Sequence, residues 1–179
     1  MRYWSATTSN WHRGMATRKR KRGNRQFIDP TGDVWDSQFE WHVYTGLRDQ
    51  GYTVRRCDQR DSIAYHTPVK EGSCLECDGT EVVQRRVYTP DLWVVEPEQA
   101  DDASTRRGYF VECKGYFPQQ RRAMLRCVAE QHPGIDLRFL FSKEVRLTKA
   151  RTNVAYVCSM IKCPAAAWNN GSFEWRYPK

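Results

Sequence analysis

The sequence has 179 residues, of which 40% are hydrophobic, with 29 Lys and Arg against 21 Asp and Glu. This length supports one domain with a buried core, and the composition excludes collagenous, fully disordered and small disulfide-stapled proteins. No stretch approaches the ~20 apolar residues that cross a bilayer, and residues 1–14 lack an apolar signal segment, so we expect a soluble cytoplasmic protein without a membrane partner.

The excess positive charge lies at the N-terminus. Residues 1–25 contain eight Lys or Arg and no acid, and the remaining residues hold 21 of each sign. The densest basic run consists of Arg18, Lys19, Arg20, Lys21 and Arg22. A cluster of this kind gains free energy by displacing counterions from phosphates. We therefore expect residues 1–25 to be a flexible arm that binds nucleic acid, with a solubilising tail as the alternative, and residues 26–179 to be the folded domain.

An amphipathic helix is predicted from Asp36, which can cap it, to about Gln50. Its apolar stripe, with a spacing of four, consists of Phe39, Val43 and Leu47. That spacing places the three side chains on one face of a helix. Glu40 lies beside the stripe, near the first turn.

Extended segments follow the helix. The sequence predicts strands at 52–57, 63–65, 81–88, 92–95 and 109–114, with polar loops at 67–80 and 96–108. If the last two strands pair as an antiparallel hairpin, a constant register aligns Asp91 with Glu112. Two carboxylates would then lie side by side.

The C-terminal part alternates helices and strands. A helix is predicted from Pro118 to Pro133, a buried strand at 137–141 and a short helix at 153–161. The order of elements predicts an α/β fold with a mixed central β-sheet flanked by helices.

One face of the predicted strand 109–114 carries chemically useful side chains. Glu112 and Lys114 share that face, whereas Cys113 points to the other, and Asp91 would lie alongside. Two carboxylates and an ammonium suit metal-dependent phosphodiester hydrolysis, because carboxylate oxygens bind Mg²⁺ and the metal offsets charge on the phosphate. A surface salt bridge across a hairpin is the alternative interpretation.

Several blocks of the chain resemble one known family. The blocks are Tyr88-Thr89-Pro90-Asp91, Phe110-Val111-Glu112-Cys113-Lys114-Gly115 and Glu130-Gln131-His132-Pro133, preceded by Ser37-Gln38-Phe39-Glu40. Their order is similar to that of the phage endodeoxyribonuclease I family, the Holliday-junction resolvases of PD-(D/E)xK type. The resemblance extends over about residues 36–142, and the stretches 67–86 and 96–108 look like insertions.

The resemblance implies a fold, a site and a substrate. It implies a restriction-endonuclease-like core in an intertwined homodimer that resolves branched DNA, in the bacterial host cytoplasm if the protein is phage-encoded. Asp91 and Glu112 would bind Mg²⁺ or Mn²⁺, Glu40 would bind the metal or its water, and Lys114 would assist the attacking water. In this family the helix glutamate comes from the partner subunit, so Glu40 would act in trans.

A pair of cysteines suggests a second metal. Cys74 and Cys77 have the C-x-x-C spacing with which two thiolates bind one tetrahedral Zn²⁺. The other two ligands would be either Cys158 and Cys163 or Cys57 and His66. Reduced loop thiols are the alternative.

Two arginines of the second predicted helix, Arg121 and Arg122, lie off its apolar stripe and are candidate phosphate contacts. Two other functions remain open from the sequence. One is a different nuclease of the same superfamily, such as a nicking, mismatch or transposon-end endonuclease. The other is a non-catalytic, zinc-containing DNA-binding module whose acids are structural.

Overall fold

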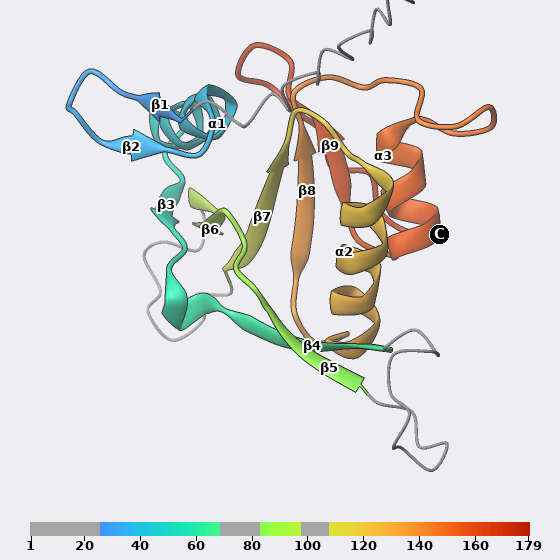
Figure 1. Cartoon of the computed structure of the whole chain (residues 1–179). Coiled ribbons are helices and arrows are strands. Elements are labelled where there is room, and N and C mark those ends of the chain that lie inside the picture. The colour runs from blue at the N-terminus through green and yellow to red at the C-terminus, as the bar shows by residue number, and fades with distance from the viewer. Residues whose placement is uncertain (1–25, 69–82, 98–107) are drawn as a thin grey trace, which may run out of the picture.

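The structure is a computed structural model that describes residues 26–68, 83–97 and 108–179 (Figure 1). The basic arm, Cys74 and Cys77, and most of the two predicted insertions lie outside the described residues. The elements are β1 (Phe27–Ile28), β2 (Val34–Trp35), α1 (Gln38–Asp49), β3 (Thr53–Arg56), the 3₁₀ turn η1 (Gln59–Asp61), β4 (Ile63–Pro68), β5 (Val83–Tyr88), β6 (Leu92–Val95), β7 (Tyr109–Lys114), α2 (Gln119–Gln131), β8 (Leu137–Phe141), α3 (Asn153–Tyr156), the π-helical turn η3 (Val157–Ile161) and β9 (Ala165–Ala167).

The centre of the fold is a five-stranded mixed sheet in the order β3-β6-β7-β8-β9. β3, β6 and β7 are antiparallel, whereas β7, β8 and β9 are parallel. Every residue of β7 and β8 is buried or half-buried, as expected for strands covered on both faces. The predicted α/β class with a mixed central sheet is confirmed.

Helices cover both faces of this sheet (Figure 1). On one face, Val43 and Leu47 of α1 pack against Val111 and Cys113 of β7. On the other, Leu125 of α2 and residues of α3 and η3 pack against the aromatic side chains of β8. Each layer buries one apolar stripe, which is the main source of stability of such a fold.

The predicted register of the β6–β7 hairpin is confirmed. Leu92 pairs with Val111 and Val94 pairs with Tyr109. Continuing this register by one residue places Asp91 beside Glu112. The hairpin therefore brings residues that are 21 positions apart in the sequence to one end of the sheet.

Helix α1 begins one residue later than predicted. Ser37, and not Asp36, is the N-cap, and its hydroxyl accepts a hydrogen bond from Glu40 N at 3.2 Å. A serine side chain satisfies a first-turn amide as an aspartate would. Glu40 lies on the buried side of α1 and is only 5% exposed.

A second antiparallel hairpin, formed by β4 and β5, lies outside the central sheet and crosses one end of α2 (Figure 1). The Gln131 side chain bonds to both the amide and the carbonyl of His66, each at 2.8 Å, and so imitates a neighbouring strand. Pairing with β5 extends β4 to Pro68, beyond the predicted end at residue 65. The last residue of β5, Tyr88, lies just before the start of β6 in the sequence.

Among the described residues, no helix has the length and apolar character needed to cross a membrane. The predicted single helix at 153–161 is α3 followed by the π-helical turn η3, which ends at Lys162 with a φ of 63°.

Candidate functional site

The predicted trio of charged side chains lies together at the ends of β6 and β7. The ammonium of Lys114 contacts Oε1 of Glu112 directly and lies 3.6 Å from Oδ2 of Asp91. The Glu112 side chain is 2% exposed, and those of Lys114 and Asp91 are 15% and 20% exposed. The trio is thus a largely buried ionic cluster and not a solvated surface salt bridge.

Two further groups hold the carboxylates in place. The Tyr88 hydroxyl donates a hydrogen bond of 2.5 Å to Oε2 of Glu112, and the Cys113 amide donates one of 2.7 Å to Oδ2 of Asp91. Charge-assisted bonds of this length restrict the carboxylate orientation. The sequence assigns no role to Tyr88. Its only signal is its place in the block that ends at Asp91.

Glu40 joins the trio from the first turn of α1. Burial raises the pKa of Glu40 to about 7, with a further contribution from Asp36, and the charges of Lys114 and Glu112 also act on it. All four residues belong to the same chain. Helix α1 packs against β7 of its own chain, and the expected contribution of Glu40 to the site of a partner subunit stays a prediction.

The cluster carries excess negative charge. Three carboxylates against one ammonium leave a formal charge of −2 when all are ionised. Burial, and then repulsion from Glu112, raise the pKa of Asp91 well above its ordinary value. Burial alone would lower the pKa of Lys114, but Glu112 and Asp91 outweigh it and raise that pKa. Lys114 is therefore charged, and the site favours an additional cation.

The donor set fits Mg²⁺ or Mn²⁺. Both ions prefer carboxylate and carbonyl oxygens, and Mg²⁺ in proteins often takes only one or two carboxylates and keeps several waters. Among the described residues, no three Asp, Glu, His or Cys side chains converge as they do around a bound ion. Lys114 contacts both Asp91 and Glu112, so its ammonium occupies part of the space between them.

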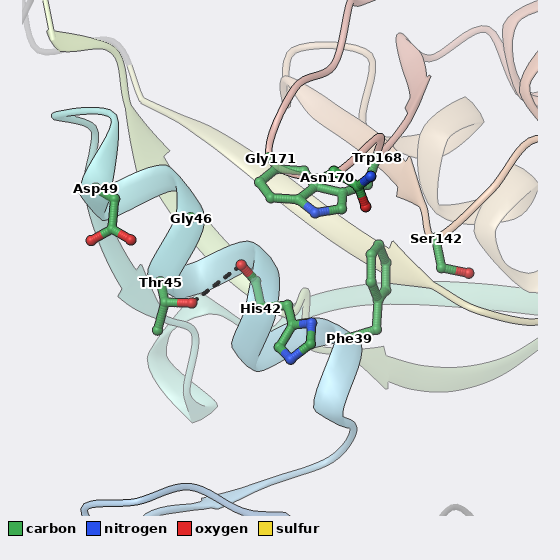
Figure 2. A pocket seen from close by; sticks show the side chains of 9 residues that line it. All are labelled: Phe39, His42, Thr45, Gly46, Asp49, Ser142, Trp168, Asn170 and Gly171. Atoms are coloured by element: carbon green, nitrogen blue, oxygen red, sulfur yellow. Dashed lines mark hydrogen bonds between the residues drawn. The ribbon is translucent and has the colours of Figure 1, made fainter.

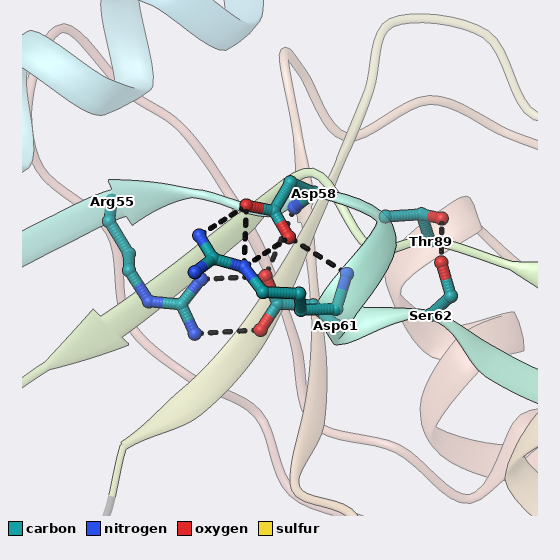
Figure 3. Close-up of polar contacts among 6 residues, drawn as sticks. Arg55, Asp58, Asp61, Ser62 and Thr89 are labelled. Atoms are coloured by element: carbon teal, nitrogen blue, oxygen red, sulfur yellow. Dashed lines mark hydrogen bonds and ion pairs between the residues drawn. The ribbon is translucent and has the colours of Figure 1, made fainter.

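A polar network holds the turn that follows β3 (Figure 3). Arg55 makes two bonds to the Asp61 carboxylate, at 2.6 and 2.7 Å, and Ser62 shares a hydrogen bond of 2.8 Å with Thr89. The Cys57 amide donates to the Asp91 carbonyl at 3.1 Å. The turn after β3 therefore anchors the backbone of Asp91.

A cavity of about 410 Å³ lies between α1 and residues 168–171 (Figure 2). Phe39, Trp168 and Ser142 are among its lining residues, and Phe39 directly precedes Glu40 in the sequence. The Ser142 amide donates to the carbonyl of Lys114 at 3.0 Å. The sequence does not predict this cavity, because its walls come from α1, the end of β8 and the C-terminal segment.

Of the other residues predicted to contact DNA, the structure describes only the two arginines of α2. Residues Arg18 to Arg22 lie outside the described residues. On α2, Arg121 is exposed and donates to the Met124 sulfur at 3.3 Å. Arg122 is half-buried, with its guanidinium carbon 5.2 Å from the centre of the Tyr156 ring.

The zinc hypothesis stays a prediction because Cys74 and Cys77 lie outside the described residues. Of the suggested partners, Cys57 and Cys163 have thiol pKa values raised by burial to about 12. Cys158 donates a hydrogen bond from its sulfur to the Arg176 carbonyl at 3.1 Å. High thiol pKa values disfavour the thiolate that binds Zn²⁺.

Comparisons with known proteins return no match: no family model fits the sequence, and neither a curated protein nor a solved structure is similar to the chain.

Proposed function

We propose that the protein is a Mg²⁺-dependent endodeoxyribonuclease that acts on branched DNA and is related to the phage endodeoxyribonuclease I family. The observation that carries the proposal is the contact of Lys114 with Asp91 and Glu112 at one end of the central sheet, with Glu40 of α1 near enough for its charge to act on theirs. Once ionised, the three carboxylates outnumber the single ammonium, and a divalent cation would balance them. The β6–β7 hairpin, with α1 on one face and α2 on the other, would be the centre of a restriction-endonuclease-like core.

The burial of the cluster supports a functional role. Removing charges from water costs more free energy than ion pairing usually returns, so apolar residues at these positions would stabilise the fold at least as well. Perturbed pKa values that concentrate at one point are typical of catalytic sites. Glu40 and Asp91 both have raised pKa values, and they come from elements that are distant in the sequence.

The residues have distinct roles in hydrolysis. Asp91 and Glu112 would hold the Mg²⁺ ion, which supplies positive charge next to the phosphate under attack. Glu40, with a pKa near neutrality, would accept a proton from the attacking water. The water oxygen would form the new bond to phosphorus, and the leaving sugar oxygen would depart with the bonding electron pair and take a proton from solvent water. Lys114 would stabilise the negative charge that accumulates on the phosphate.

The choice of branched DNA rests on the resemblance and on the charge distribution. A basic arm attached to a neutral domain would hold phosphates without reading bases. In a homodimer, two sites would cut two strands of a junction in one encounter. A nuclease of the same superfamily that prefers linear DNA would share the same four residues.

The proposal is tested by incubating a labelled four-way junction and the matching linear duplex with the protein in Mg²⁺ or in EDTA. We expect cleavage of the junction in Mg²⁺ alone, and a fall of at least about 10²-fold in rate for Glu112→Gln, as is common when a charge-stabilising catalytic group is removed. Glu130→Gln is the matched control, because Glu130 is exposed and pairs only with Arg126 among the described residues. Its rate should stay within twofold of the wild type.

Three results would count against parts of the proposal. Equal cleavage of the linear duplex would retain the nuclease chemistry and refute the selectivity for branches. Binding of the junction without any cleavage would favour the non-catalytic DNA-binding module. Undiminished cleavage by Glu112→Gln would refute the proposed site.

A further inference from the structure

A second cavity, of about 440 Å³, lies at the N-terminal end of α2. Its wall begins at Gly115, directly after Lys114, and continues to Arg122. The opposite wall is formed by residues 145–147 and Asn153. Two arginines and no acidic side chain of the described chain line this cavity, so its charge is positive.

Arg122 carries a buried donor that has no acceptor. Its Nε atom is inaccessible to solvent and has no hydrogen-bond partner within the residues that the structure describes. Over the same described ranges, Arg122 forms no ion pair, whereas Arg126, one turn later, pairs with Glu130 at 2.7 Å. The guanidinium carbon lies 5.2 Å from the centre of the uncharged Tyr156 ring, so no described group neutralises the charge of Arg122.

The start of α2 offers further donors on the same wall. The N-cap residue is Pro118, which makes no side-chain bond to the first turn, and no acid lies in that turn. The amides at the start of the 13-residue helix therefore lack an intrahelical acceptor, and the helix dipole favours an anion there.

The opposite wall is held in place by one buried amide. Asn153 Oδ1 accepts hydrogen bonds from Val145 N and Val154 N, at 3.1 and 3.0 Å, and its Nδ2 donates to the carbonyl of Lys143 at 3.0 Å. These bonds order the loop that presents Arg146. Arg146 is exposed and has no ion pair with any described side chain.

We propose that this cavity binds a backbone phosphate of the DNA strand, close to the phosphate that is cleaved beside Lys114. The inference rests on the proposed function and extends it to a second contact with the same substrate. Two residues of extended chain span at most about 7 Å, so the cavity wall at Gly115 and Tyr116 lies within about 7 Å of the Lys114 backbone. Phosphates of one strand succeed one another every ~3.4 Å along the helix axis, which makes a phosphate one or two nucleotides away the fitting occupant.

The phosphate oxygens would accept hydrogen bonds from the Arg122 guanidinium and from the first-turn amides of α2, while Arg146 would add charge at the mouth of the cavity. A guanidinium suits this role because its donors form a planar fork that matches phosphate oxygens. Binding here would fix the strand relative to Asp91 and Glu112.

The test measures binding of a labelled four-way junction in EDTA, where cleavage cannot occur, over a series of salt concentrations. Arg122→Gln should weaken binding at least about tenfold and reduce the slope of log affinity against log salt by about one. Arg122→Lys should give an intermediate loss, since it keeps the charge without the fork. Arg126→Gln, on the same helix with its charge already paired, is the control and should bind within twofold of the wild type.

Folding is checked by thermal unfolding of each variant. If Arg122→Gln does not fold, Arg146→Gln decides instead, because Arg146 is exposed; we expect a loss of about threefold and a lower salt slope. Junction binding by these variants within twofold of the wild type, with an unchanged slope, would overturn the inference while leaving the nuclease proposal intact.

A second experiment, with inorganic phosphate as the ligand, does not depend on the nuclease proposal. Phosphate should raise the Tm of the wild type more than that of Arg122→Gln. If phosphate does so but no junction binding is found with any protein, the cavity takes a free anion, and both the DNA assignment and the proposed function are wrong.

Discussion

At the scale of single residues, the raised pKa of Glu40 makes the stability of the protein depend on pH. Its folded pKa of about 7 is above the ordinary value of 4.5, so the folded state binds a proton more tightly than the unfolded state. The stabilising contribution is complete below the unfolded pKa of about 4.5 and is lost as the pH rises through about 7. In the metal-free protein, ionisation of Glu40 near neutral pH therefore lowers the free energy of unfolding.

This yields a prediction for the metal-free protein. The free energy of unfolding of Glu40→Gln minus that of the wild type should rise by about 2–4 kcal/mol between pH 4.5 and pH 8, because Gln cannot ionise. Urea unfolding in EDTA at several pH values measures it. Parallel profiles for the two proteins would contradict a raised pKa of Glu40.

The sequence predicts some residues of the site and not others. Strand alternation and hairpin register predict that Asp91, Glu112 and Lys114 meet, because both rules depend on local spacing. The hydrogen bond from Tyr88 and the buried Nε of Arg122 depend on how β5 and α3 pack around the sheet. No local pattern contains that information.

At the scale of elements, long periodic segments were predictable and short ones were not. The apolar spacing in α1, the continuous apolar run of β6 and the apolar run of β8, which only Arg138 interrupts, specify their elements directly. β1, β2 and β9 have only two or three residues each and exist through their pairing with β-strand neighbours. Strands this short contain too few residues to show an alternation of apolar and polar side chains.

One glycine in α1 shows how tertiary packing overrides helix propensity. A Cβ at Gly46 would lie 2.7 Å from Cζ2 of Trp168, whose ring stacks on Phe173 at 5.7 Å between centroids. The glycine lets the C-terminal segment lie directly on α1 and form the wall of the cavity in Figure 2.

We therefore expect Gly46→Ala to destabilise the protein by about 1–3 kcal/mol, although Ala is favoured by about 1 kcal/mol in a free helix. Gly134→Ala is the control, since its Cβ would meet no atom within 4 Å. Its stability should stay within about 0.5 kcal/mol of the wild type. Urea unfolding of both variants gives the comparison, and a stabilised Gly46→Ala would show that Trp168 does not lie on α1.

At the scale of the whole molecule, charge is divided among distinct regions. The eight basic residues within residues 1–25 account for the net charge of +8, and the rest of the chain is neutral. Within that neutral part, the cluster of Glu40, Asp91, Glu112 and Lys114 is acidic, and the cavity at Arg122 and Arg146 is basic. An acidic site flanked by a basic one is suited to a metal ion and the phosphates of a strand that crosses it.

The measurement that tests this account most directly is a calorimetric titration of the protein with Mn²⁺ at pH 8, because it examines the cation site without any assumption about the substrate. We predict binding by the wild type that is lost in Asp91→Asn and in Glu112→Gln and retained in the surface variant Glu130→Gln. Binding of the same strength in Asp91→Asn, or none in the wild type, would contradict the assignment of the cluster as a divalent-cation site.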